Sequence, residues 1–244
     1  MEDHLDRLYN FAAAIYMKPP LDRESLRSLL MDLVDRNSRL ITERDLLIDV
    51  IFSGGLDGGT MKQSSRGAHL YIAVQEMEPP PAACYEKGMA LATYPHQRMC
   101  ADVKLLNYVG AILGHQTVVP QFEAEEVLFI DPVDRQTILE GSTFAVFFVD
   151  SEGTILTPPL DRRILDSITR RVVLEILKDR HEFPVREVPV SINQVSSFPE
   201  AFIASTTRNV VPVTRINSSV IGSGTPGPVT KSVAKIFLEY LESY

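Results

Sequence analysis

Lys104 is the lysine whose surroundings in this sequence best suit covalent chemistry. Six of the seven lysines stand beside prolines or glycines or on polar helix faces, whereas Lys104 lies in the apolar run Val103-Lys104-Leu105-Leu106. We expect this run to bury the amine, and burial lowers the pKa of a lysine so that it can attack a carbonyl carbon. Many lysines in mixed sequence extend to solvent instead, so the run alone leaves both interpretations open.

A second group of residues could bind a phosphate. Either Asp166 or Ser167 is expected to cap a helix that starts at Ile168 and Thr169. The first amides of a helix have no acceptor within it, and such an end attracts anions. The hydroxyl run Ser205-Thr206-Thr207 follows an expected strand and could contact the same anion, although hydroxyl runs also form simple turns.

Glu140 is a candidate carboxylate. The block Glu140-Gly141-Ser142 stands just before an apolar strand expected over residues 144–149. A solvated strand end is the simpler interpretation, and one carboxylate does not define a site.

Together these blocks resemble the fold type IV pyridoxal-phosphate enzymes, that is, the D-amino-acid and branched-chain aminotransferases and the aminodeoxychorismate lyases. Seven blocks follow one another in the family's order between about residues 5 and 230, which argues against a chance match. They are His4-Leu-Asp-Arg-Leu-Tyr9, Asp102-Val-Lys-Leu-Leu-Asn107, Glu140-Gly-Ser142, Leu156-Thr-Pro158, Ile164-Leu-Asp-Ser-Ile-Thr-Arg170, Ser205-Thr-Thr207 and Val211-Pro-Val213.

The resemblance implies pyridoxal 5'-phosphate as the cofactor and gives each residue a role. Lys104 would form a Schiff base with the cofactor and shuttle a proton between the substrate carbon and the cofactor. Glu140 would pair with the pyridine nitrogen, and Arg7 would bind the phosphate. The remaining phosphate contacts would come from the amides of Ile168 and Thr169 and from Thr206.

The function implied by the resemblance is transfer of an amino group between an amino acid and a 2-oxo acid. One alternative is elimination of pyruvate by an aminodeoxychorismate lyase, and another is a cofactor-binding homologue without turnover. Asn107-Tyr108 differs from the Asn-Arg-Leu continuation common in the lyases, which favours transamination. Because two subunits border each active site in this family, we also expect a homodimer.

The elements that must position these residues mix helices and strands without strict alternation. This pattern favours an α+β fold with a largely antiparallel sheet. Helices are expected over residues 5–16, 26–34, 105–115, 167–178 and 229–240. Strands are expected over residues 46–52, 70–74, 89–94, 126–130, 144–149, 185–190, 201–204 and 210–216, with a strand and turn over 151–157.

Pro79-Pro80-Pro81 indicates a boundary between two domains, because three prolines keep the backbone extended. We predict a small α/β domain over residues 1–78, a linker over 79–83 and a large cofactor-binding domain over 84–244. Members of the family carry several strands before the helix expected at 5–16. We therefore expect a small domain that lacks its first strands.

Composition limits the partners and the compartment. The 24 basic and 32 acidic residues give a net charge of −8, which argues against nucleic acid as a partner. The longest apolar runs are too short to span a membrane, and no segment at the N-terminus resembles an export signal. Cys84 and Cys100 have no histidine or second thiol at metal-ligand spacing, so neither disulfides nor a metal site are expected. The expected compartment is the cytoplasm.

Overall fold

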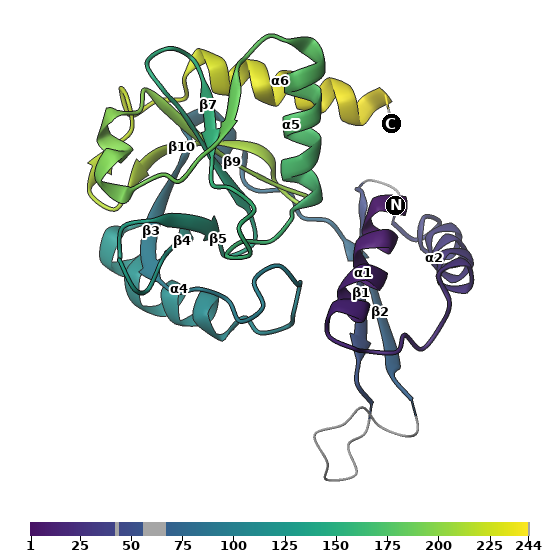
Figure 1. Cartoon of the computed structure of the whole chain (residues 1–244). Coiled ribbons are helices and arrows are strands. Elements are labelled where there is room, and N and C mark those ends of the chain that lie inside the picture. Colours follow the sequence, from purple (N-terminus) through teal and green to yellow (C-terminus); the bar gives the residue numbers. More distant parts are fainter. Residues whose placement is uncertain (42–43, 56–66, 244) are drawn as a thin grey trace. The chain divides into compact units, whose positions relative to one another are not determined.

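The chain divides into two compact units in the computed structural model, Met1–Pro79 and Pro80–Tyr244 (Figure 1). The structure describes residues 1–41, 44–55 and 67–243. The glycine-rich loop of residues 54–59 follows the strand expected over residues 46–52. Its residues 56–59 lie outside the described residues. In the part of the chain that is described, no helix is both long and apolar enough to cross a membrane.

The first unit consists of two helices and a β-hairpin. Its elements are α1 (Glu2–Ala14), α2 (Arg23–Asn37), β1 (Leu46–Ser53) and β2 (His69–Glu76). The two strands pair antiparallel from Leu46 opposite Glu76 to Ser53 opposite His69. Leu5 of α1 and Leu26 and Leu30 of α2 are buried against apolar side chains of the hairpin. Because strand side chains alternate between faces, these helices cover one face of the hairpin.

The second unit contains the remaining helices and strands. The helices are α3 (Ala82–Lys87), α4 (Val109–Phe122), α5 (Ile168–Arg180), the 3-10 helix η1 (Ile192–Ser197) and α6 (Pro228–Ser243). The strands are β3 (Met89–Pro95), β4 (Glu126–Ile130), β5 (Ile138–Gly141), β6 (Ala145–Val149), β7 (Ile155–Thr157), β8 (Val185–Glu187), β9 (Glu200–Ser205), β10 (Asn209–Ile216) and β11 (Ser219–Val220).

These strands form one mixed sheet in the order β5-β4-β3-β10-β9-β6-β7-β8, with β11 beside β10. The pairs β3/β10, β3/β4 and β7/β8 are parallel, and the other pairs are antiparallel. The sheet curls toward closure, because the Ile138 amide donates to the Val190 carbonyl and Thr137 bridges to Ser191. The two ends of the sheet thus enclose one core that includes Leu128 of β4 and Val146 of β6.

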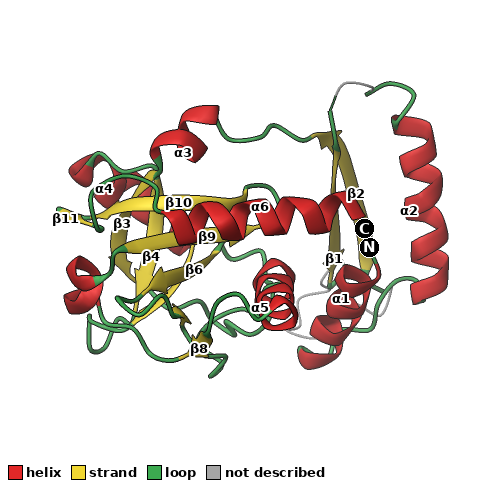
Figure 2. Cartoon of the chain, turned by 90° about the horizontal axis from the view of Figure 1, so that it is seen from above, coloured by secondary structure: helices red, strands yellow, loops and turns green. Residues whose placement is uncertain are grey.

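Helices cover the outer face of this sheet (Figure 2). α5 and α6 bury Val173, Leu177 and Phe237 against Phe147 and Phe202, two rings that stack 4.7 Å apart. α4 packs on β3 and β4 through a separate cluster that includes Ala111 and Phe129. The α+β class and the mainly antiparallel pairing expected from the sequence are confirmed.

The element boundaries differ from expectation at two places that matter for the site. α4 begins at Val109 and not at residue 105, because residues 100–108 form a sequence of tight turns. Ile138–Gly141 forms a fully buried strand, β5, that the sequence analysis did not predict. A strand of four residues offers too few alternating positions to stand out as a pattern.

Candidate active site

Lys104 lies in the loop between β3 and α4 and is exposed, so the expectation that its amine is buried is wrong. Ala101 and Val103 are buried and anchor the loop, and Lys104 extends away from them. Its Nζ donates a hydrogen bond to the hydroxyl of Tyr108, 3.4 Å away, at the start of α4. The apolar run predicted burial for the whole segment, but only alternate residues of the loop reach the core.

Glu140 lies inside β5 and is 7% exposed, so it is not a solvated strand end. Arg98 donates to Oε1 from Nε at 3.0 Å and again from its Nη2. The Leu165 amide donates to Oε2 at 3.1 Å. Burial raises the pKa of the Glu140 carboxyl above its ordinary value, while the charges of Arg98 and Lys104 act in the opposite direction.

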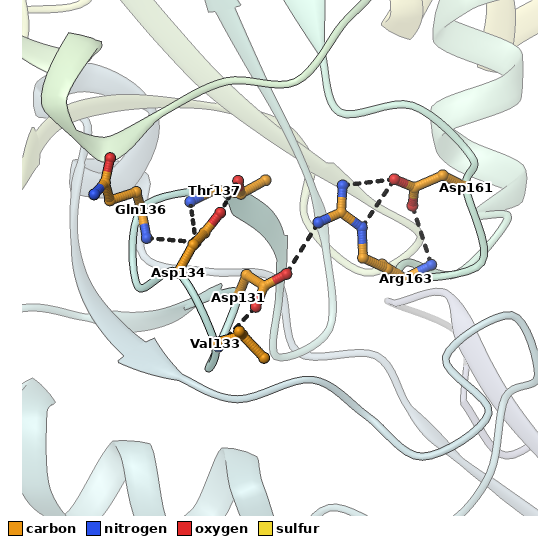
Figure 3. A network of polar contacts seen from close by, with 7 residues as sticks. All are labelled: Asp131, Val133, Asp134, Gln136, Thr137, Asp161 and Arg163. Atoms are coloured by element: carbon orange, nitrogen blue, oxygen red, sulfur yellow. Dashed lines mark hydrogen bonds and ion pairs between the residues drawn. The ribbon is translucent and has the colours of Figure 1, made fainter.

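A polar network fixes the loop that carries Leu165 (Figure 3). The Arg163 guanidinium contacts Asp131 at 3.0 Å and Asp161 at 2.6 Å. Asp131 follows β4, so this contact ties the loop that carries Leu165 to the end of β4. The fixed loop holds the Leu165 amide where it meets Glu140.

A second part of the same network shapes the turn that leads into β5 (Figure 3). The Asp134 carboxylate accepts from the Gln136 amide at 2.7 Å and from the Thr137 amide at 2.9 Å. It also accepts from the Thr137 hydroxyl, which is the main cause of the lowered pKa of Asp134. An ionised Asp134 thus shapes the turn from which β5 carries Glu140 into the interior.

The N-terminus of α5 forms a small polar cradle with the turn after β9. Ser167 is the cap, since its hydroxyl accepts the Arg170 amide at 3.3 Å, which decides between the two expected caps. The geometry of an α-helix leaves the amides of Ile168 and Thr169 without an acceptor in the helix. The Thr206 hydroxyl lies 3.4 Å from the Thr169 hydroxyl. Amides, hydroxyls and the positive end of the helix dipole are the groups that bind phosphate.

Arg7 lies on α1, in the first unit, and is half-buried. Its guanidinium carbon lies 5.8 Å from the centre of the Phe11 ring, within the range of a cation–π contact. The other five sequence-predicted site residues all lie in the second unit.

Three residues near these groups were not singled out from the sequence: Arg98, Tyr108 and Leu165. Burial of Glu140 would have pointed to a residue like Arg98, because a buried carboxylate requires a positively charged partner, but the sequence did not predict that burial. The sequence has several arginines and does not say which one provides that charge. Leu165 acts through its backbone amide. Almost every residue type has this group, so the sequence could not point to Leu165.

The second unit fits pyridoxal 5'-phosphate on its own observed contacts. The cofactor carries a basic ring nitrogen, a carbonyl carbon and a phosphate. The buried, ion-paired Glu140 suits a protonated ring nitrogen, and the free amides at the start of α5 suit the phosphate. Lys104 supplies an exposed amine that is bonded to the Tyr108 hydroxyl.

Comparisons with known proteins all find similarity to aminotransferases. Residues 1–216 match the family model described as amino-transferase class IV. A putative branched-chain-amino-acid aminotransferase of Methanocaldococcus jannaschii is 28% identical over 97% of this chain and 80% of the relative. A D-alanine aminotransferase of Bacillus licheniformis is 30% identical over 96% of this chain and 79% of the relative. A solved branched-chain aminotransferase from Thermoproteus uzoniensis, with norvaline, superimposes with a TM-score of 0.83, at 24% identity, over 99% of this chain and 78% of that chain.

Proposed function

Because the chain belongs to the amino-transferase class IV family, we infer that it is an aminotransferase that uses pyridoxal 5'-phosphate to move an amino group from an amino acid to a 2-oxo acid. The observation that carries this function to particular residues is the buried Glu140 carboxylate, which Arg98 and the Leu165 amide hold in place. We propose that Lys104 and Glu140, with Ile168, Thr169, Thr206 and Arg7, form the site.

Each proposed residue has a separate task. When bound, the cofactor supplies a carbonyl carbon that accepts the amino group and a ring that accepts electrons. Lys104 Nζ would act as the base that takes the proton from the substrate α-carbon and delivers it to the former carbonyl carbon of the cofactor. The Tyr108 hydroxyl, bonded to Lys104 Nζ at 3.4 Å, orients the amine. Glu140 holds a proton on the ring nitrogen by offering it a negative charge.

The phosphate would be held by elements other than the loop that carries the reacting amine. The amides of Ile168 and Thr169 and the Thr206 hydroxyl donate to its oxygens, and they need no change of protonation to do so. The resemblance implies a phosphate contact for Arg7 as well, since a guanidinium can donate two parallel hydrogen bonds to a phosphate. These contacts would fix the orientation of the ring, so that Lys104 can move the proton between two defined carbons, the substrate α-carbon and the former carbonyl carbon of the cofactor.

The test of this function is amino transfer measured with purified protein and added pyridoxal 5'-phosphate. D-alanine and L-leucine serve as alternative donors and 2-oxoglutarate as acceptor, and glutamate formation is followed by mass spectrometry. We expect transfer from at least one donor in a panel of D- and L-amino acids, and none by Lys104→Ala. Release of pyruvate from aminodeoxychorismate without transfer would instead identify a lyase. Cofactor binding without either reaction would identify a homologue without turnover.

We also propose that the active form is a homodimer. An exposed apolar surface runs from the loop after Lys104 along the first turns of α4. It consists of Leu106, Val109, Ile112 and Leu113, which are 65%, 61%, 57% and 48% exposed. A cluster of this kind marks an interaction surface more often than a solvated one. A second copy that covers it would also lie beside Lys104.

The proposed compartment is the cytoplasm. Among the described residues, Cys84 and Cys100 are both free thiols. Free thiols are stable in a reducing environment, which supports this location.

A further inference from the structure

Arg98 and Glu140 form a tightly enclosed ion pair in the second unit. The side chains are 11% and 10% exposed, and two guanidinium nitrogens of Arg98 contact the same oxygen, Oε1. Arg98 lies in the loop after β3, six residues before Lys104. The Arg98 side chain thus links two elements of the proposed site. It lies in the loop that carries Lys104, the proposed base, and it contacts Glu140 of β5, the proposed partner of the ring nitrogen.

The hydrogen bonds of Glu140 leave room for one more donor. An ionised carboxylate has about four acceptor positions, two on each oxygen. Among the described residues, Arg98 fills two positions on Oε1 and the Leu165 amide fills one on Oε2. One position on Oε2 remains, which is what a single protonated ring nitrogen requires.

We propose that Arg98 is a positioning residue of the aminotransferase reaction: it keeps Glu140 charged and reserves one acceptor position of Oε2 for the ring nitrogen of the cofactor. This inference rests on the proposed function, because it assigns the ring nitrogen to Glu140. Arg98 itself acts through Glu140 and does not touch the reacting atoms.

The electrostatics of the pair support this role. Burial raises the pKa of Glu140, and the charge and hydrogen bonds of Arg98 are the largest opposing influences, followed by the Leu165 amide and Lys104. Without Arg98, Glu140 would take up a proton from solvent more readily. A protonated Glu140 is neutral and would donate to an unprotonated ring nitrogen, so the ring would lose its positive charge and much of its capacity to accept electrons.

The first test uses the protein without cofactor. We compare the urea midpoints of wild type and Arg98→Gln at pH 8 and pH 5. A carboxyl with a raised pKa in the folded state costs stability as pH rises through the interval above its ordinary value of 4.5. Arg98→Gln raises the pKa further, so its loss of stability is expected to be larger at pH 8 than at pH 5.

A matched background isolates the contribution of Glu140. Burial lowers the pKa of His96, and the charge of Arg98 lowers it further. Removal of Arg98 can therefore change the pH dependence of stability through His96 as well as through Glu140. The same comparison in a Glu140→Gln background removes the carboxylate and keeps His96. We expect the pH-dependent part of the loss to shrink strongly there, and Arg98→Lys to restore part of the midpoint at pH 8. A pH-dependent part of the loss that is equal in both backgrounds would overturn the role of Arg98.

The second test measures the ring nitrogen directly. Pyridoxal 5'-phosphate with a ¹⁵N-labelled ring is added to wild type, Arg98→Gln and Arg208→Gln. Arg208 is the matched control, because it pairs with Glu126, a buried carboxylate that the proposed site does not use. We expect a protonated ring nitrogen in wild type and in Arg208→Gln, and a resonance shifted toward unprotonated pyridine in Arg98→Gln.

The two tests separate the two proposals. An unchanged resonance in Arg98→Gln, with cofactor bound, would overturn the inference while leaving the aminotransferase function in place. A wild type that takes up no cofactor would overturn the proposed function, and with it the ring-nitrogen role. The urea comparison would still decide whether Arg98 keeps Glu140 charged.

Discussion

The hydroxyl groups of Thr169 and Thr206 lie 3.4 Å apart, although 37 positions separate them in the sequence. Thr169 belongs to the first turn of α5, and Thr206 to the turn between β9 and β10. The contact places a side-chain hydroxyl beside amides that the helix leaves free. An anion at this end of α5 can therefore be bound from two elements at once.

Thr206→Val is expected to weaken binding of pyridoxal 5'-phosphate about tenfold, as is typical for the loss of one hydrogen bond to a charged group. Titration of the cofactor-free protein, followed by absorbance, measures the dissociation constant. Thr207→Val is the control, because this neighbouring hydroxyl has no assigned contact with the phosphate. Equal weakening by both substitutions would remove Thr206 from the phosphate site.

Substitutions of Ser167 separate the helix cap from the anion site. Ser167→Ala removes the acceptor of the Arg170 amide and should lower the free energy of unfolding by about 1 kcal/mol. Ser167→Asp keeps a cap and should keep the stability, but it brings a negative charge toward the bound phosphate. We therefore expect Ser167→Asp to bind the cofactor more weakly than Ser167→Ala. Urea unfolding and cofactor titration of both variants provide the two measurements.

The sequence predicted most of the long elements, because their apolar periodicity reports directly on burial. β4, for example, begins and ends at the expected residues, Glu126 and Ile130. Ser167 was one of two expected caps, since residue type alone indicates a helix start. Local patterns are thus sufficient where the governing interactions are local.

The site itself depends on interactions that local patterns do not contain. Glu140 is buried because Arg98, 42 residues earlier, compensates its charge. Lys104 is exposed although its neighbours are apolar, because tight turns around residues 100–108 direct only some of them inward. The resemblance to a family pointed to the residue types of the site. The buried ion pair between Arg98 and Glu140 required three-dimensional contacts.

Arg7→Ala is expected to weaken cofactor binding by a factor of about 10 to 100, because a guanidinium–phosphate contact is a charge-assisted pair of hydrogen bonds. Arg27→Ala is the control, since Arg27 lies in the same unit and pairs with Glu2 at an exposed position. Dissociation constants from cofactor titration and urea midpoints of both variants are compared. A loss of stability with unchanged affinity would return Arg7 to a structural role in α1.

Ile112→Glu is expected to convert the proposed homodimer into a monomer, because it places a charge in the exposed apolar surface of α4. Light scattering during size-exclusion chromatography measures the mass in solution. Leu238→Glu is the control, since Leu238 is similarly exposed on α6, outside that surface. A wild type that is monomeric at micromolar concentration would overturn the dimer, whereas a dimeric Ile112→Glu would place the interface elsewhere.

Lys104 is expected to be the residue that binds the cofactor covalently. After borohydride reduction of the cofactor-loaded wild type, peptide mass spectrometry should find the pyridoxyl group on the peptide that contains Lys104. Lys104→Ala should carry no such label and should lose amino transfer by a factor of at least about 100, as expected for removal of a general base. Its cofactor affinity should fall less than its activity, because the phosphate contacts remain. Lys87→Ala is the control and should be labelled as wild type. A label on another lysine would disprove the assignment and would move the proposed base away from Glu140 and Tyr108.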